Sequence, residues 1–235
     1  MTDAKKVLIT GATRGIGHAV SELLSTEGYE VIGLARSADS RFPGKLIQVD
    51  LLNAVKRREI LASLFHDHQF YGVINNAGTN TLNLIEDVTD QDYRRIMELN
   101  LDIPFEICRH ALPSMKHYRE GRVVNISSRA MLGRARASVY ASAKSGLIGL
   151  TRSLALEGAE FGVTVNAIAP GPIGTEMFHS NNPETSDETK RLMSRVPMKR
   201  IGEPEEVAFA VSYFMNKKAA FTTGQTLFVC GGMSL

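Results

Sequence analysis

Two side chains four residues apart, Tyr140 and Lys144, have the types and spacing needed for proton transfer. They lie in a segment, 138–160, whose pattern predicts a helix, and residues at this spacing share one helix face. A phenol has a pKa of about 10, and a nearby ammonium lowers it by stabilising the phenolate. A shift of about three units corresponds to about 4 kcal/mol. The pair therefore predicts a tyrosine that is general acid in reduction and general base in oxidation.

A serine that can assist this tyrosine follows the predicted strand 121–127. Ser128 stands at the carboxyl end of that strand, where open α/β sheets bind their ligands. Its hydroxyl is placed to hold a substrate oxygen next to Tyr140. Taken singly, a helical Tyr–Lys pair or a serine at a strand end is common and needs no function, so the interpretation depends on their combination with other motifs.

A glycine-rich loop lies between the first predicted strand, 6–10, and the first predicted helix, 15–27. Gly11, Gly15 and Gly17 allow a tight turn and the close approach of backbone to a pyrophosphate. The helix that follows offers unpaired N–H groups and the positive end of its dipole to that anion. The position of the loop at a strand-to-helix junction predicts a dinucleotide site, although the spacing is GxxxGxG and not GxGxxG.

The end of the second predicted strand indicates which dinucleotide binds. Sites that prefer NAD carry Asp or Glu there for the ribose 2′-hydroxyl, whereas this chain reads Gly33-Leu34-Ala35-Arg36-Ser37. The planar guanidinium of Arg36 suits a 2′-phosphate, and Arg14 in the glycine loop is a second candidate. Either arginine alone is equally consistent with a solvated surface charge. Together with the missing acid, they predict NADP(H) as the cofactor.

Short apolar runs alternate with longer helical segments along the whole chain, with no repeat and no linker. Strands that are apolar on both faces and alternate with helices predict a single-domain, Rossmann-like, doubly wound parallel sheet of about seven strands, spanning 1–235. Pro104 falls inside one long predicted helix and is expected to kink or break it. The predicted strands are 6–10, 30–35, 45–49, 71–75, 121–127, 163–168 and 225–229; the predicted helices are 15–27, 53–66, 89–115, 138–160 and 204–215.

The segment at about 174–200 shows no clear period. A long irregular segment late in an α/β chain is either a functional lid or a disordered surface loop. Its apolar residues favour a substrate lid, and a permanently packed pair of short helices is the remaining alternative. Those apolar residues are Met177, Phe178, Leu192, Met193, Val196 and Met198.

Composition and charge narrow the class of protein. The 27 basic and 25 acidic side chains give a net charge of +2, which offers no reason to expect nucleic acid or an anionic membrane as partner. Cys108 and Cys230 cannot form a disulfide framework or a four-thiolate metal site, and we expect two reduced, buried thiols and no metal. No apolar run approaches the roughly 18 residues of a membrane span. We therefore expect a cytoplasmic protein.

Taken together, the motifs resemble the short-chain dehydrogenase/reductase (SDR) family. The resemblance covers nearly all 235 residues, and the motifs are jointly specific although each is weak alone. Among the members of the family, the chain is most similar to the 3-oxoacyl-[acyl-carrier-protein] reductases. The matching motifs, in chain order, are Gly11/Gly15/Gly17, Asn75-Asn76-Ala77-Gly78, Asn100, Ser128, Tyr140/Lys144 and Pro170-Gly171.

This resemblance implies a role for each residue that matches a family motif. Tyr140 is the acid/base, Ser128 orients the substrate, and Lys144 also holds the nicotinamide ribose. Asn100 anchors a water that leads from the lysine to solvent.

Further matching residues are implied to contact the dinucleotide. Asn76-Ala77-Gly78 lies along the adenosine ribose, and 170–175 closes over the nicotinamide. Asp50 contacts the adenine edge, with a solvated loop carboxylate as its alternative. The full set expected to bind the cofactor is Gly11, Thr13, Arg14, Gly15, Ile16, Gly17, Arg36, Asp50, Leu51, Asn76, Ala77, Gly78, Tyr140, Lys144, Pro170, Gly171, Ile173 and Thr175.

Two positions depart from the family pattern. The interval from Ser128 to Tyr140 is one residue shorter than usual, and Ser127 would restore it. We still assign Ser128, because the second serine of such a pair is the one that members of this family usually employ. Cys230 stands where many relatives carry aspartate, within a carboxyl-terminal region that resembles the tail with which these enzymes pack as tetramers. The resemblance thus implies a homo-oligomer, a tetramer. The cysteine at position 230 removes a negative charge from the tail that would pack this assembly.

Three arginines near the predicted active site bear on the class of substrate. Arg129, Arg134 and Arg136 flank the predicted active-site loop, where they suit an acidic carrier or a phosphopantetheine, or are solvated charges. The leading hypothesis is NADP(H)-dependent reduction of a 3-oxoacyl thioester, on a small molecule or a carrier. The alternatives are oxidation of a small free alcohol, cyclic alcohol or sugar, and a catalytically silent dinucleotide-binding regulator. The intact Ser128, Tyr140 and Lys144 argue against the silent regulator.

Overall fold

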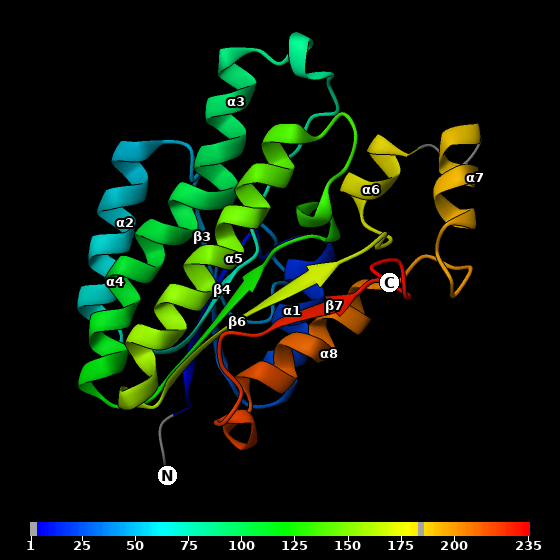
Figure 1. Cartoon of the computed structure of the whole chain (residues 1–235). Helices are drawn as coiled ribbons and strands as arrows, with labels where there is room; N and C mark the ends of the chain where they lie inside the picture. Colours follow the sequence, from blue (N-terminus) through cyan, green and yellow to red (C-terminus); the bar gives the residue numbers. More distant parts are fainter. Residues whose placement is uncertain (1–3, 183–185) are drawn as a thin grey trace.

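Seven parallel strands form one sheet with helices on both faces (Figure 1). The computed structural model describes residues 4–182 and 186–235. The strand order is β3-β2-β1-β4-β5-β6-β7, which confirms the predicted single-domain, doubly wound parallel sheet. The strands are β1 (Lys6–Thr10), β2 (Glu30–Ala35), β3 (Lys45–Gln48), β4 (Phe70–Asn75), β5 (Gly121–Ile126), β6 (Val163–Pro170) and β7 (Thr226–Val229).

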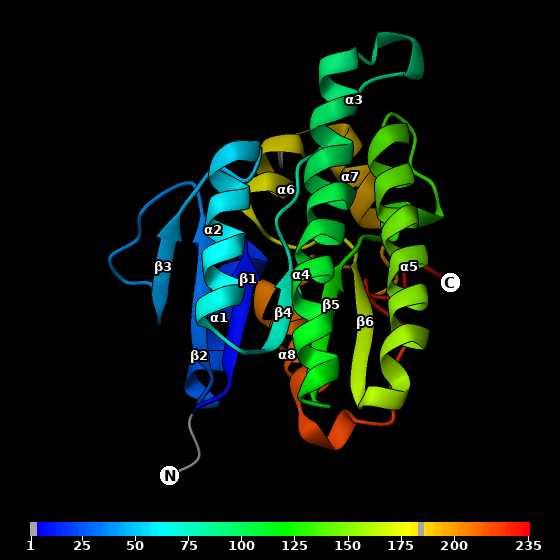
Figure 2. The same ribbon diagram turned by 90° about the vertical axis from the view of Figure 1, so that its left-hand side faces the viewer.

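Apolar side chains on both faces of the sheet create two separate cores. One core packs the sheet against α1 and α8, and the other packs it against α2, α4 and α5. Figures 1 and 2 show these two groups of helices on opposite faces of the sheet. The central strands β4, β5 and β6 are buried along their whole length, which explains their continuous apolar character. The helices are α1 (Gly15–Thr26), α2 (Ala54–Asp67), α3 (Asp90–Met97), α4 (Ile103–His117), α5 (Ser138–Gly158), α6 (Glu176–Asn181), α7 (Asp187–Ser194) and α8 (Pro204–Met215).

The predicted boundaries of most elements hold to within one or two residues, and the end of β6 is one of those that differ by two. The sequence predicts its end at Ile168, but the strand continues to Pro170. Its last four residues pair with the edge strand β7, which gives their backbone groups partners. This extension carries Pro170-Gly171 to the carboxyl end of the sheet, where the predicted cofactor site lies.

The long helix predicted over 89–115 is interrupted just before Pro104, where the sequence predicts a kink or a break. A π-helix, η2 (Glu98–Asp102), separates α3 from α4, and Pro104 lies in the first turn of α4. Proline has no N–H to donate to the carbonyl of Asn100 four residues earlier, so the regular ladder cannot continue there. Such π segments frequently mark functional sites, and this one contains Asn100.

The segment 174–200, which shows no clear period in the sequence, contains two short helices, α6 and α7, as one of the alternatives above allows. The side chains of Thr175 and Ser186 accept hydrogen bonds from the third N–H of each helix, a common N-terminal cap. Helices this short leave little periodicity to detect. The end of the segment is anchored, since Val196 is buried and the Met198 amide donates to the Gly231 carbonyl at 3.2 Å.

Both cysteines are buried free thiols. Within 4–182 and 186–235, no helix is long and apolar enough to cross a membrane, and no cluster of three or more His, Cys, Asp or Glu side chains is arranged to hold a metal ion.

Candidate active site

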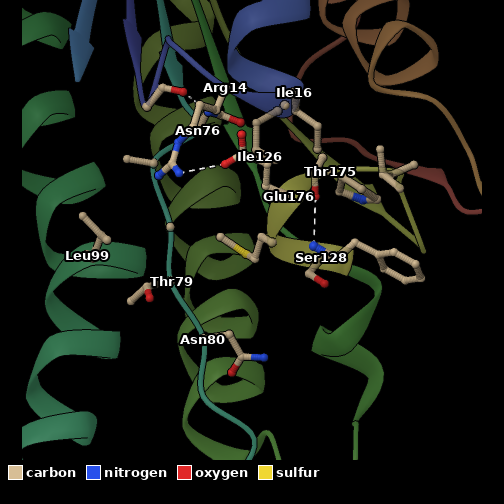
Figure 3. A pocket seen from close by; sticks show the side chains of 18 of the residues that line it. Arg14, Ile16, Asn76, Thr79, Asn80, Leu99, Ile126, Ser128, Thr175 and Glu176 are labelled. Atoms are coloured by element: carbon tan, nitrogen blue, oxygen red, sulfur yellow. Dashed lines mark hydrogen bonds and ion pairs between the residues drawn. The ribbon is translucent and has the colours of Figure 1, made fainter. Parts of the chain in front are cut away.

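A cavity of about 710 Å³ opens at the carboxyl ends of the strands (Figure 3). The loops that follow β1, β2, β3, β4, β5 and β6 all contribute to its wall, as the topology of an open α/β sheet requires. Of the residues predicted to bind the cofactor, all but Gly17 line it, as does Ser128. Those that do are Gly11, Thr13, Arg14, Gly15, Ile16, Arg36, Asp50, Leu51, Asn76, Ala77, Gly78, Tyr140, Lys144, Pro170, Gly171, Ile173 and Thr175.

The glycine loop is closely packed, and this explains the position of Gly17. A Cβ on Gly17 would lie 2.1 Å from the carbonyl oxygen of Gly11 and 2.5 Å from Nδ2 of Asn76, so no larger residue fits. Gly11 has a φ of +66°, which favours glycine. Gly17 therefore shapes the loop from beneath the cavity, and Gly11 forms part of the wall itself.

The loop after β4 is held against β1 by paired hydrogen bonds. Asn76 Nδ2 donates to the carbonyl oxygens of Thr10 and Gly11 at 3.0 and 3.1 Å. In return, Thr10 Oγ1 accepts from the amides of Asn76 and Ala77 at 3.0 and 2.9 Å. This network fixes the two loops relative to each other, because every polar group named is satisfied inside the protein.

The two adjacent serines point in different directions. Ser127 Oγ is buried and donates to the carbonyl oxygen of Lys144 at 3.0 Å. Ser128 Oγ accepts from the Ala130 amide at 3.1 Å, and its hydroxyl acts to lower the pKa of Tyr140. Ser128 is therefore the serine whose hydroxyl adjoins the tyrosine, which favours it over Ser127 as the residue that holds a substrate oxygen.

The electrostatics of Tyr140 and Lys144 differ from the simple expectation. Burial raises the pKa of Tyr140, while the hydroxyl of Ser128 and the charge of Arg134 act in the opposite direction. Burial lowers the pKa of Lys144 to about 7, and its Nζ donates to the Ile126 carbonyl at 2.7 Å. The prediction that Lys144 depresses the phenol pKa is wrong, because it considered the charge of the lysine and not the burial of the two side chains.

Asn100 is fully buried beside the lysine. Its Nδ2 donates to the carbonyls of Thr79 and Ile96, both at 2.8 Å. Its Oδ1 has no partner among the residues described, and a Cβ on Gly78 would lie 2.7 Å from that oxygen and 3.6 Å from Lys144 Nζ. The structure thus brings Asn100, Gly78 and Lys144 together, with an unsatisfied acceptor that suits a water or a ligand.

The two arginines predicted to meet a 2′-phosphate both line the cavity and are exposed. Arg14 Nη1 contacts Glu176 Oε2 at 2.8 Å, across the opening between the glycine loop and α6 (Figure 3). The Asp50 carboxylate accepts from the Leu52 amide at 3.0 Å and so shapes its own loop. Arg36 extends from the end of β2, where no acidic residue stands.

The cavity wall also contains residues that the sequence singled out for other reasons: Ser127, Arg134, Met177 and Phe178. Sequence reasoning missed the rest, most of which lie beside a motif residue in the chain or belong to α3 or α6, so proximity in sequence was the only signal for them. These residues are Leu34, Ala35, Ser37, Val49, Leu52, Thr79, Asn80, Arg95, Leu99, Ile126, Glu176, Ser180 and Asn182.

The family model described as enoyl-(acyl carrier protein) reductase matches residues 11–234. The chain belongs to the SDR family. It is 38% identical to a 3-oxoacyl-[acyl-carrier-protein] reductase of Vibrio cholerae and 36% identical to that of Escherichia coli. In both comparisons the match covers 98% of each chain.

Solved structures of similar proteins share the whole fold. The aldohexose dehydrogenase of Thermoplasma acidophilum superposes with a TM-score of 0.90 at 32% identity, covering 98% of this chain and 94% of that one. An actinorhodin polyketide ketoreductase solved with NADPH gives 0.90 at 30% identity, over 100% and 98%. A putative gluconate 5-dehydrogenase of Beutenbergia cavernae with bound NADP gives 0.91 at 28%, over 97% and 96%. This SDR chain is therefore an oxidoreductase.

Proposed function

We propose that the chain reduces the ketone of 3-oxoacyl thioesters with NADPH, and that Ser128, Tyr140 and Lys144 carry the chemistry. The observation that carries this proposal is that Ser128, Tyr140 and Lys144 line the same cavity, with Lys144 one helical turn from Tyr140 on α5. Full-length similarity to 3-oxoacyl-[acyl-carrier-protein] reductases supports the substrate class. Oxidation of a sugar or small alcohol is the second candidate, favoured by the fold shared with an aldohexose dehydrogenase.

The residues present fit NADP(H). Gly11 has a φ of +66°, and Gly17 has no room for a Cβ, so both positions favour glycine. The glycine loop leads into α1, whose N-terminal amides suit a pyrophosphate. Arg14 and Arg36 supply positive charge at one end of the cavity, and β2 ends without an acid. Two solved relatives were described with NADP or NADPH bound.

When bound, NADPH supplies a hydride to the carbonyl carbon. In this proposal Ser128 holds the carbonyl oxygen and Tyr140 gives it a proton. Burial lowers the pKa of Lys144, and the negative charge of a bound dinucleotide favours its ammonium form. That ammonium, 5.7 Å from the ring centroid of Tyr140, then stabilises the phenolate left after proton transfer. Asn100 anchors the water through which the lysine exchanges protons with solvent.

Alanine at each of the two serines tests the assignment of Ser128. We expect Ser128→Ala to lower kcat/KM roughly tenfold or more, because the substrate oxygen loses a hydrogen bond in a buried site. Ser127→Ala is the matched control, since its hydroxyl donates to the Lys144 carbonyl and does not face Tyr140. A larger loss for Ser127→Ala than for Ser128→Ala would reverse the assignment.

We also propose that the segment at about 174–200 acts as a substrate lid. Thr175, the N-cap of α6, and Glu176, Met177 and Phe178 of that helix line the cavity, and Met177 is 46% exposed. The anchored residues from Val196 onward give this segment a fixed end about which α6 and α7 can close. Closure would bring apolar side chains over the reacting atoms and exclude water there.

Hydrogen exchange tests the lid. Amides of α6 and α7 are expected to exchange quickly in the free enzyme and to gain protection when NADP and a substrate analogue bind. The buried strand β5 provides an internal control that should exchange slowly in both states. Slow exchange of α6 and α7 in the free enzyme, unchanged by ligands, would show that they are a permanently packed scaffold.

We propose that the enzyme is a homotetramer in the cytoplasm, acting on a small-molecule or carrier-bound substrate without nucleic acid or membrane. Exposed aromatic and aliphatic side chains on α8 and around the edge strand β7 support an assembly surface: Phe209, Tyr213, Phe221 and Leu227. Sedimentation equilibrium of the full chain measures the oligomeric state directly, and a monomer would contradict this part of the proposal.

A further inference from the structure

A buried arginine that the proposed mechanism does not use lies on α2. Arg57 is 6% exposed, whereas Arg58, the next residue of the same helix, is exposed. A charged side chain is almost never buried in this way unless it is paired. Its Nε donates to Glu106 Oε2 at 2.8 Å, and its Nη1 donates to Glu98 Oε1 at 3.0 Å and to the carbonyl of Leu51. One guanidinium therefore joins three other segments of the chain to α2.

Two of these segments belong to the wall of the cavity. Leu51 lies in the loop between β3 and α2 and lines the cavity. Glu98 is the first residue of the π-helix η2, and the next two residues are Leu99, which also lines the cavity, and the buried Asn100. Glu106 is 8% exposed on α4, which lies beside α2 on one face of the sheet (Figure 1). The buried guanidinium thus connects two parts of the cavity wall that are far apart in sequence.

The topology of the sheet indicates which half of a dinucleotide lies at the loop after β3. In a doubly wound sheet the adenosine ribose is recognised at the end of β2, and β3 is the neighbour of β2 at the edge of the sheet. Ser128 and Tyr140 lie beyond β5, on the other side of β1, and the nicotinamide has to reach them for hydride transfer. The loop after β3 therefore lies at the adenine end of the cavity.

The loop after β3 depends on Arg57 more than the π-helix does. Because β3 is an edge strand, the sheet supports this loop from one side. The bond from the Leu52 amide to Asp50 Oδ1, at 3.0 Å, shapes the turn but does not connect it to α4 or η2. The π-helix, in contrast, continues from α3 directly into α4, and Nδ2 of Asn100 donates to two main-chain carbonyls. Loss of the guanidinium should therefore free the loop and leave the π-helix in place.

We propose that Arg57 is a positioning residue for the dinucleotide. Through its bond to the Leu51 carbonyl, it holds the loop after β3 in the form that receives the adenine half of NADPH. Glu98 and Glu106 fix the guanidinium in the orientation that this bond requires. This role rests on the proposed function in taking NADP(H) as the ligand. It does not depend on which ketone the enzyme reduces, so binding measurements test it separately from turnover.

The test uses a double variant that removes the guanidinium without leaving its most buried partner as an unpaired charge. It combines Arg57→Met with Glu106→Leu, because apolar replacement of both partners of a buried ion pair is often neutral for stability, whereas removal of one partner is not. The side chain of Glu98 is 32% exposed and can turn to water. Arg58→Met is the matched control, since it removes the same charge from an exposed position on the same helix.

Dissociation constants are measured for NADPH by fluorescence titration and for adenosine 2′,5′-bisphosphate, the adenine half alone, by calorimetry. Both are expected to rise about tenfold in the double variant, which corresponds to the loss of one hydrogen bond from a charged group. With saturating NADPH and an acetoacetyl thioester, kcat should stay within about threefold, and Tm should stay within about 4 °C. Arg58→Met should leave every one of these quantities within the same limits, because it is an exposed substitution.

A merely structural role of Arg57 predicts a lower Tm and lower kcat with unchanged dissociation constants. That pattern, or an unchanged dissociation constant for the bisphosphate at normal Tm, would overturn the inference. If the double variant does not fold, Arg57→Lys decides, because it keeps a charge for the two glutamates and loses the forked geometry. A rise of at least about threefold in the dissociation constant of the bisphosphate then supports the positioning role, and an unchanged constant refutes it. Failure of the unmodified enzyme to reduce the thioester would contradict the proposed function and leave these binding results valid.

Discussion

Replacing Tyr140 by phenylalanine is expected to reduce kcat by at least about a hundredfold, because the variant keeps the ring and loses only the proton that is transferred. The loss should appear in steady-state rates of NADPH oxidation with an acetoacetyl thioester. The dissociation constant for NADPH, measured by fluorescence titration, should change little, since the phenol hydroxyl faces Ser128 at the substrate end of the cavity.

A tyrosine outside the site provides the control for this substitution. Tyr93 is exposed on α3 and does not line the described cavity. Tyr93→Phe should therefore keep near-full activity. If Tyr140→Phe also keeps near-full turnover, the acid/base assignment is wrong and another donor must protonate the product.

The second large effect is a preference of at least about tenfold for NADPH over NADH in dissociation constant. One charge-assisted hydrogen bond from Arg14 or Arg36 to a 2′-phosphate is worth roughly 1.5–3 kcal/mol, which is tenfold or more. Ala35→Asp should narrow or invert the preference, because a carboxylate at the end of β2 repels the phosphate and accepts from a 2′-hydroxyl. Equal dissociation constants for the unmodified enzyme would refute the assignment of cofactor specificity.

The neutral substitution Ala35→Asn separates charge from size at this position. Ala35 is buried at the cavity wall, so both side chains must displace neighbouring atoms. Only aspartate adds a negative charge, and only aspartate should change the ratio of the two dissociation constants strongly.

Arg14 must also leave Glu176 to meet a phosphate, but an exposed ion pair contributes about 1 kcal/mol or less, so this cost is small.

The sequence predicts the positions of the backbone elements well because the apolar runs are long and buried. Because β4, β5 and β6 are buried along their whole length, their sequences are continuously apolar and predict a parallel sheet. Pro204 predicts the start of α8. The motif glycines lie where the chain turns closely, so their positions in the cavity wall or beneath it follow from type and spacing alone.

Other features depend on contacts between distant segments and could not be predicted. The contact between Arg14 and Glu176 joins residues 162 positions apart. Burial sets the pKa of Lys144, and no local pattern reports how deep that side chain lies. The caps that hold α6 and α7 are local, but the helices are too short for their period to be recognised.

Oxidation of NADPH by an acetoacetyl thioester, followed by absorbance with the purified full chain, tests the central claim most directly. The account predicts steady turnover with NADPH, weaker turnover at equal low concentrations of NADH, and almost none with Tyr140→Phe. A panel of sugars and small alcohols with NADP⁺ is run in parallel to detect the alternative substrates. Absence of NADPH oxidation by the thioester, in an enzyme that binds NADPH, would contradict the account.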